Sequence, residues 1–370
     1  MSRAPALSVA AGRLRGVGTR TPAGPVLTVA QLNRAVLARQ LLLDRVELDP
    51  PAVLERVAGL QTQYAPTGYV GLWSRVRGFR RTHLTDALLA GEVVQGWVMR
   101  CTIHMVSAAD YPLLTEAVRE PRRRWWQRSA GAAAEVDMDA VADLVRGYLV
   151  DGPLKQAEIQ QRLVADGLPR EVWQAVQLWV DLVRHPSAGT WERPRAHVYA
   201  LADPDLAPDP PLDVAASRDL LARRYLGGFG PASAKDVASF CGWSITEARR
   251  VLARLELRRF TDEAGGELVD LPDAPLPDPD APAPVRFLGQ WEAVLLVHAR
   301  RAQVLPEEHR SKVFHTRVPQ SVRTFLVDGR VAGTWTVDGG LRWEPFEELD
   351  PAHRRAVDEE AERLAAFHEG

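Results

Sequence analysis

Three successive stretches of the chain repeat one order of elements, short helices followed by two strand-like segments. This repeat restricts the fold more than any other feature. Residues 29–94 carry apolar side chains at the three- and four-residue spacing of helices, before the β-forming run "GWVMRCTIHMV" at 96–106. The same order returns over 154–201 and over 217–271. Because helices followed by a β-hairpin are the pattern of a winged helix, we expect three such units in tandem.

Turn residues and changes in composition set the expected boundaries. Gly265-Gly266 predicts a turn inside the third repeat, and Asp328-Gly329 and Asp338-Gly339 predict hairpins in a β-rich region that follows a proline-rich linker. The fold class is therefore α+β, mainly α with β wings. The expected parts are a flexible basic tail at 1–26, winged-helix units at 27–150, 151–210 and 211–275, a linker at 276–285, a β-rich domain at 286–346 and a helix at 347–370.

The overall charge of the chain does not indicate a partner. The 370 residues include 46 Lys and Arg against 48 Asp and Glu, so any DNA binding requires a local basic face. Cys101 and Cys241 lack the spacing of zinc ligands or of a disulfide framework, and no apolar run is long enough to span a bilayer. We therefore expect a cytoplasmic protein without a metal or a cofactor, and the tail at 1–26 could also be a basic arm that touches DNA.

Two arginine clusters, "RVRGFRR" and "PRRRWWQR", could supply the local charge. Arginine binds backbone phosphates, and the tryptophans beside the second cluster either pack in the core or stack on bases. The alternative for the arginines is a solvated surface. A third polar group lies in "HARR". The residues expected to bind DNA are Arg75, Arg77, Arg80, Arg81, Arg100, Arg122, Arg123, Arg124, His298, Arg300 and Arg301.

The segment "LQTQYAP" places two glutamines one residue apart. On a helix, Gln61 and Gln63 would point about 200° apart, whereas in an extended segment both would project to one side. Pro66 disfavours a helical conformation at the residue before it, so we expect the chain to leave a helix here. Two convergent amides could then hold a water through their carbonyl oxygens. The alternative is a solvated helix end.

His104 is a candidate neighbour of this pair. It alternates with Thr102 and Arg100, so all three project from one face of an expected strand. A hydrogen-bonded structural histidine is the alternative. We expect His104, Thr102 and Tyr64 to support a site at the two glutamines.

Five motifs carry a resemblance to a known family, in the order "GLQTQYAP…GLWSRV", "VMRCTIHMV", "SAGTWERPR", "YLGGFGPASAKDVASFCGW" and "FLVDGRVAGTW". They resemble the AlkZ/YcaQ family of winged-helix DNA glycosylases from Leu27 to Trp343. The resemblance implies a C-shaped molecule of three winged helices and a C-terminal β-domain around duplex DNA. It also implies hydrolysis of the N-glycosidic bond of N7-alkylguanine, without a metal.

The catalytic motif of this family is Gln-x-Gln or Gln-x-Asp, and Gln61-Thr62-Gln63 matches the first form. The resemblance therefore implies the AlkZ-like branch, which acts on bulky adducts or interstrand crosslinks, in antibiotic self-resistance or in alkylation repair. It implies double-stranded DNA with alkyl adducts as the partner of a monomer. The chain departs from the family after Trp291-Glu292, where Arg300 replaces an acid in a loop expected near the DNA. The alternative function is a non-catalytic winged-helix regulator or adduct-binding protein.

Overall fold

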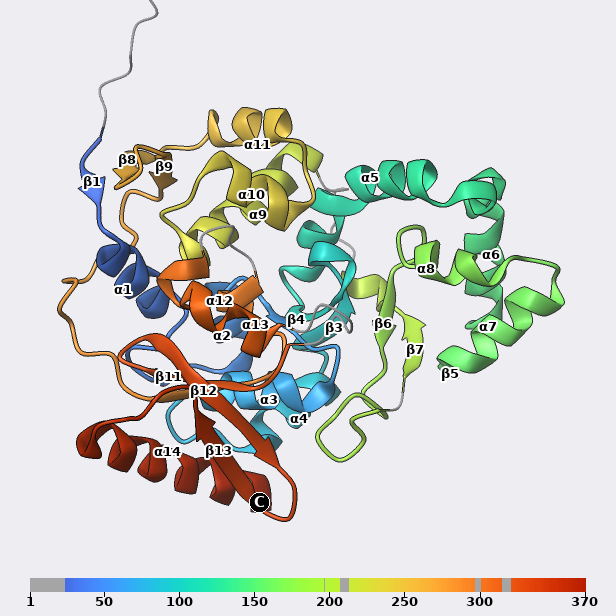
Figure 1. Ribbon diagram of the computed structural model, residues 1–370. Helices are drawn as coiled ribbons and strands as arrows, with labels where there is room; N and C mark the ends of the chain where they lie inside the picture. The colour runs from blue at the N-terminus through green and yellow to red at the C-terminus, as the bar shows by residue number, and fades with distance from the viewer. Residues whose placement is uncertain (1–23, 196, 207–212, 297–300, 315–320) are drawn as a thin grey trace, which may run out of the picture.

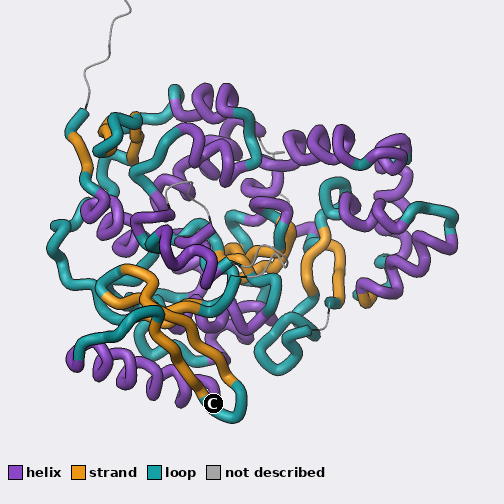
Figure 2. Tube along the Cα trace, viewed as in Figure 1, coloured by secondary structure: helices purple, strands orange, loops and turns teal. Residues whose placement is uncertain are grey.

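Three sheets and the helices around them make up the protein in this computed structural model, which describes residues 24–195, 197–206, 213–296, 301–314 and 321–370 (Figures 1 and 2). The strand orders within the described residues are β1-β8-β9, β10-β11-β12-β13 and β2-β4-β3-β6-β7-β5. Helices and strands are mixed along the described residues, which agrees with the expected α+β class. The number of winged helices and the C-shaped outline stay predictions.

The first part of the chain contains four helices and a β-hairpin. Thr28 caps the first helix through the N–H of Gln31, and Asp49 caps the second before its opening prolines. The elements are α1 (Val29–Arg39), α2 (Pro50–Arg56), β2 (Leu60–Gln61), α3 (Ala65–Trp73), α4 (Arg81–Leu89), β3 (Val93–Trp97), the 3₁₀ turn η1 (Met99–Cys101) and β4 (Ile103–Ser107).

A long helix then carries the chain into a second group of elements, the arm on the right of Figure 1. These are α5 (Tyr111–Ser129), α6 (Met138–Tyr148), β5 (Leu154–Lys155), α7 (Gln156–Ala165), α8 (Trp173–Val176), β6 (Leu182–Arg184) and β7 (Val198–Leu201). The hairpins of the first two expected units share one sheet, because Gly96 of β3 pairs with Val183 of β6.

The third group ends in another hairpin, with Gly265-Gly266 in its turn as predicted. Its elements are β1 (Val26–Leu27), α9 (Val214–Phe229), α10 (Ala234–Cys241), α11 (Ile245–Leu252), β8 (Arg258–Asp262) and β9 (Glu267–Asp270). Val26 pairs with Thr261 and so belongs to β1, which means that the boundary predicted for the tail at residue 26 lies too far along the chain. Residues 1–23 of that tail lie outside the described residues.

The C-terminal part is an antiparallel sheet covered by a helix, as expected. The predicted turns at Asp328-Gly329 and Asp338-Gly339 join its strands. The elements are β10 (Arg286–Leu288), α12 (Ala293–Leu296), α13 (Arg310–Val313), β11 (Thr324–Val327), β12 (Arg330–Val337), β13 (Leu341–Pro345) and α14 (Pro351–Glu369). The linker before it has no helix or strand, yet Arg34 Nε holds it by donating to the Ala281 carbonyl at 2.7 Å.

Candidate active site

The two glutamines lie at the edge of the six-stranded sheet. Gln61 ends β2 and pairs with His104 of β4, and its side chain is buried at 6% exposure, whereas Gln63 is exposed in a bend. Arg100 Nη1 donates to Gln61 Oε1 at 3.2 Å, and the Ile103 N–H donates to Gln63 Oε1 at 3.3 Å. Both amide carbonyls therefore accept a hydrogen bond from the β3–β4 hairpin, and each keeps a second lone pair.

The chain reaches this position by a route that the sequence did not predict. We expected the chain to leave a helix here because of Pro66, but α2 already stops at Arg56. Ala58 and Gly59 then adopt positive φ angles of 62° and 76°, which turn the chain into β2. Pro66 lies in the first turn of α3 and so begins a helix, since its missing N–H costs nothing there.

His104 is buried beside Gln61 and is neutral at physiological pH. Its Nδ1 lies 3.0 Å from the Thr102 carbonyl oxygen, which can only accept, so the proton sits on Nδ1. Burial above all, together with the charges of Arg100 and Arg122, lowers the pKa of His104 to about 3, although the hydrogen bond to Thr102 acts in the opposite direction. A histidine with this pKa cannot act as a general acid near pH 7.

Thr102 and Tyr64, the other two residues expected to support the site, also flank the glutamines. The Thr102 hydroxyl lies 3.3 Å from His104 Nδ1 and donates to the Met99 carbonyl at 3.3 Å. Tyr64 is half-buried at the N-cap position of α3, directly after Gln63.

Arg184 is the main contact that the sequence analysis missed. This buried residue of β6 donates to the Thr62 carbonyl at 3.3 Å and to the Gln63 carbonyl at 3.4 Å. It also donates to Gln95 Oε1 at 3.2 Å. The second hairpin therefore holds the backbone of the Gln-x-Gln segment. No local pattern could reveal this, because Arg184 is 121 residues away from Gln63 in the chain.

The structure corrects several of the arginines predicted to bind DNA. Arg75 is fully buried and pairs with Glu292 at 2.8 Å, so it cannot reach a phosphate. Arg81 donates to the Phe367 carbonyl at 2.5 Å and stacks over Trp191. The guanidinium groups of Arg75 and Arg81 therefore bind groups inside the protein.

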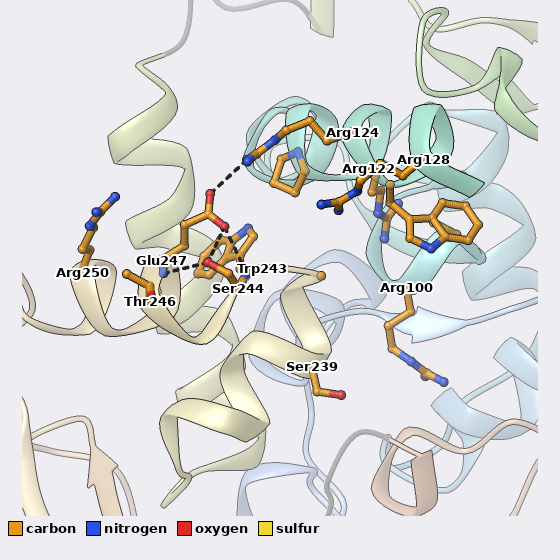
Figure 3. A pocket seen from close by; sticks show the side chains of 14 residues that line it. Arg100, Arg122, Arg124, Arg128, Ser239, Trp243, Ser244, Thr246, Glu247 and Arg250 are labelled. Carbon is orange, nitrogen blue, oxygen red and sulfur yellow. Dashed lines mark hydrogen bonds and ion pairs between the residues drawn. The ribbon is translucent and has the colours of Figure 1, made fainter. Parts of the chain in front are cut away.

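The remaining arginines of the two clusters differ in their surroundings. Arg123 donates to the Leu178 carbonyl at 2.8 Å and stacks on Trp179, which makes it a contact between α5 and the arm. Arg77 and Arg80 are exposed and stay candidates for DNA contact. Arg100, Arg122 and Arg124 line one cavity beside the glutamines (Figure 3).

The predicted polar group in "HARR" is mostly outside the described residues. His298 and Arg300 fall within 297–300, which are not described, and Arg301 begins the 3₁₀ turn η5 (Arg301–Gln303) without a described side chain. Within the described ranges, no cluster of three or more His, Cys, Asp or Glu side chains could hold a metal ion. None of the helices described combines the length and the apolar character needed to cross a bilayer.

The comparisons with known proteins identify the family. The family model described as "DNA glycosylase AlkZ-like" matches residues 54–367. The chain belongs to the AlkZ-like DNA glycosylase family. The solved structure of the DNA glycosylase AlkZ from Streptomyces sahachiroi matches with a TM-score of 0.76 over 93% of this chain and 97% of that chain. The two sequences are 21% identical, so this match shows the AlkZ fold. No curated protein matches the sequence.

Membership confirms the family resemblance that the motifs predicted. It also supports DNA as the substrate and a DNA glycosylase as the class of enzyme, because the family model is described as a DNA glycosylase. The Gln-x-Gln branch within the family, the roles of the individual site residues and the lesion stay predictions.

Proposed function

We propose that this protein is a monofunctional DNA glycosylase that hydrolyses the N-glycosidic bond of bulky, cationic N7-alkylguanine adducts, including interstrand crosslinks. Gln61 and Gln63 are the proposed catalytic residues. The observation that carries this proposal is that both amide carbonyls are held by donors from the tip of one hairpin. The proposed partner is duplex DNA with alkyl adducts, bound by a cytoplasmic monomer in antibiotic self-resistance or alkylation repair.

The proposed mechanism needs no strong acid or base. An N7-alkylated guanine already carries a positive charge, so it can leave without protonation, and the neutral, buried His104 is compatible with this. The catalytic requirement is to stabilise the oxocarbenium character of the sugar and to position a water. The carbonyl dipoles of Gln61 and Gln63 can do both, because each oxygen keeps one free lone pair.

Arg100 and Arg184 would serve as positioning residues in this mechanism. Arg100 fixes the amide plane of Gln61 through its oxygen, and Arg184 fixes the backbone of Gln63. An amide held in this way needs little rearrangement when charge develops on the sugar. A pair of neutral amides gives weak stabilisation compared with a carboxylate, which restricts the enzyme to lesions with an activated leaving group.

The decisive test uses duplex DNA with one N7-alkylguanine, followed by alkali to cleave abasic sites. Wild type should produce scission, and Gln61→Ala and Gln63→Ala should each lower the single-turnover rate constant by about 10- to 100-fold, because each removes a dipole directed at the transition state. Gln161→Ala, an exposed glutamine on α7, is the matched control and should retain the rate. Excision of uncharged 1,N6-ethenoadenine at a comparable rate would contradict the mechanism.

A non-catalytic DNA-binding regulator is the second candidate. The observation that favours it is the turn between α10 and α11, where Gly242 has a φ of 71° and joins two short helices as in a helix-turn-helix. A regulator would bind one operator sequence without scission and would ignore the loss of Gln61 or Gln63. Scission by wild type that depends on both glutamines would exclude it.

A further inference from the structure

A cavity of about 860 Å³ lies between α5, the tip of the β3–β4 hairpin and the turn that joins α10 to α11 (Figure 3). Among the described residues, five arginines and one acid, Glu247, line it. The arginines are Arg100, Arg122, Arg124, Arg128 and Arg250. The charge of the lining is therefore strongly positive, which attracts anions.

The single acid of the cavity is already neutralised by neighbouring arginines. At the start of α11, Glu247 accepts a hydrogen bond from the Ser244 hydroxyl and another from Arg124 at 3.2 Å. Arg218 lies 4.0 Å from the same carboxylate. By contrast, Arg128 and Arg250 are exposed and form no ion pair within the described part of the chain. Their charges are available to a ligand.

Arg122 has an unusual environment within this lining. Its side chain is almost fully buried, at 3% exposure for the residue, and neither Nη1 nor Nη2 has a hydrogen-bond partner among the residues that the structure describes. A buried charge without a partner costs free energy, so such groups in folded proteins are normally paired. An anionic ligand in the cavity would supply the missing acceptors.

An aromatic wall accompanies the positive charge. Trp125 on α5 is 53% exposed, whereas the next residue, Trp126, is buried in the core of the arm. A half-exposed indole beside arginines is the arrangement with which proteins hold single-stranded nucleic acid, since every base can stack on it. Trp126 therefore packs in the core, and Trp125 is the member of the pair that remains accessible for stacking on a base.

The cavity is connected to the candidate active site through Arg100. This residue lines the cavity and also donates to Gln61. Arg100 and Cys101 both have left-handed backbone angles, φ 55° and 53°, a strained arrangement for residues other than glycine. The hairpin tip thus holds Arg100 at the boundary between the two sites.

We propose that this cavity binds one unstacked nucleotide of the DNA next to the lesion, with its phosphate on Arg122, Arg128 and Arg250 and its base on Trp125. The identity of the ligand as DNA rests on the proposed function. A nucleotide held outside the base stack would open the duplex beside the adduct. This would expose the glycosidic bond to Gln61 and Gln63 even where a bulky adduct cannot swing out of the helix.

The test compares two fluorescent single strands, a thymidine decamer and an abasic decamer that has the same phosphates without bases. Wild type should bind the thymidine decamer about 10-fold more tightly in anisotropy titrations, because only this ligand can stack. Trp125→Ala should abolish that preference and leave the abasic affinity unchanged. Arg128→Ala and Arg250→Ala should weaken both ligands equally and reduce the slope of log affinity against log salt by about 0.7 each.

Two controls are needed to interpret the measured affinities. Arg355→Ala removes an exposed arginine of α14 and should change neither affinity nor slope. Arg122→Met tests the buried guanidinium, and Arg122→Lys, which retains the charge, should restore most of the binding lost in the Met variant. Thermal melts of both variants separate a loss of binding from a loss of folding.

The outcomes distinguish this proposal from the proposed function. Equal binding of the two decamers by wild type, or an unchanged preference in Trp125→Ala, would overturn the nucleotide site even if lesions are excised. A Trp125-dependent preference without any strand scission would support the site and reject the glycosylase. Displacement of both decamers by inorganic phosphate at constant ionic strength would indicate a free-phosphate site and would also overturn the proposal.

Discussion

Individual arginines in this chain serve different purposes although they share one chemistry. Arg75 neutralises a buried acid, Arg81 packs on aromatic rings, Arg100 orients an amide, and Arg122 is buried with no acceptor for its terminal nitrogens among the described residues. What decides among these roles is the nearest acceptor that the fold brings to each guanidinium. Of these four arginines, only Arg122 is buried with terminal nitrogens that no acceptor among the described residues contacts.

The buried His104 makes a prediction about stability and pH. Its pKa is lowered to about 3 in the folded state, so the unfolded chain binds a proton below about pH 6.5 that the folded protein excludes. The free energy of unfolding should therefore fall as the pH drops from 6.5 towards 3, with a slope of up to about 1.4 kcal/mol per pH unit from this group. Urea denaturation between pH 4 and 7 measures it.

His104→Gln should flatten this pH dependence by the contribution of one proton. His368→Gln is the matched control, because burial also lowers the pKa of His368, to about 4, and this residue belongs to α14 instead of the strand next to Gln61. It should remove its own contribution and retain that of His104, so the double variant should be flatter than either single variant. Identical slopes for wild type and His104→Gln would contradict the assignment.

At the scale of elements, the β3–β4 hairpin organises the candidate site. Its two strands are largely buried, and β4 pairs with β2 on one side and β3 on the other. The tip carries two consecutive left-handed residues, Arg100 and Cys101. This conformation costs about 1–2 kcal/mol for each residue with a Cβ atom, and it places Arg100 within reach of Gln61.

Cys101→Gly should test that strain. Glycine adopts a φ of 53° without a Cβ clash but loses more entropy on folding, so the free energy of unfolding should stay equal or rise by up to about 1 kcal/mol. Thr102→Gly, one residue later at a φ of −132°, has no such strain to relieve and should be destabilising. Urea denaturation of both variants measures the difference, and a larger loss in Cys101→Gly would refute the argument.

At the scale of the whole molecule, buried ion pairs join parts of the chain that are far apart in sequence. Arg39 of α1 pairs with Asp270 of β9 at 2.6 Å, with both side chains fully buried. Arg75, just after α3, pairs with Glu292 of the C-terminal part, 217 residues further along. Since α3 begins two residues after Gln63, the C-terminal part helps to hold the candidate active site in position.

Breaking the Arg75–Glu292 pair should destabilise the protein strongly. Glu292→Ala leaves a fully buried guanidinium without its acid, and such losses cost about 3–5 kcal/mol. The double variant Arg75→Met with Glu292→Leu should lose much less, because neither charge remains buried. Chemical denaturation measures both.

The exposed pair Arg77–Glu47 provides the control for this experiment. Its atoms are 3.6 Å apart and its side chains are 69% and 80% exposed, so Arg77→Ala should change the free energy of unfolding by less than about 0.5 kcal/mol. A Glu292→Ala variant as mildly affected as Arg77→Ala would show that burial does not control the strength of the pair.

Local rules succeeded where a few neighbouring residues decide the structure. The turns at Gly265-Gly266, Asp328-Gly329 and Asp338-Gly339 were all predicted correctly, since turn chemistry acts within three or four residues. Pro66 was misread because the same local rule permits two outcomes. Proline is unfavourable after a helical residue and favourable in a first turn, and β2 decided which applied.

The sequence by itself determined the family, the order of most elements and the presence of two closely spaced glutamines. Only the tertiary structure decided that Arg75 would be buried, that Arg184 would clamp the Gln-x-Gln backbone and that Arg122 and Trp125 would line one cavity. The physical reason is the separation along the sequence between the residues that interact. Turn chemistry and periodicity depend on near neighbours, whereas burial and charge pairing depend on acceptors that arrive from more than a hundred residues away.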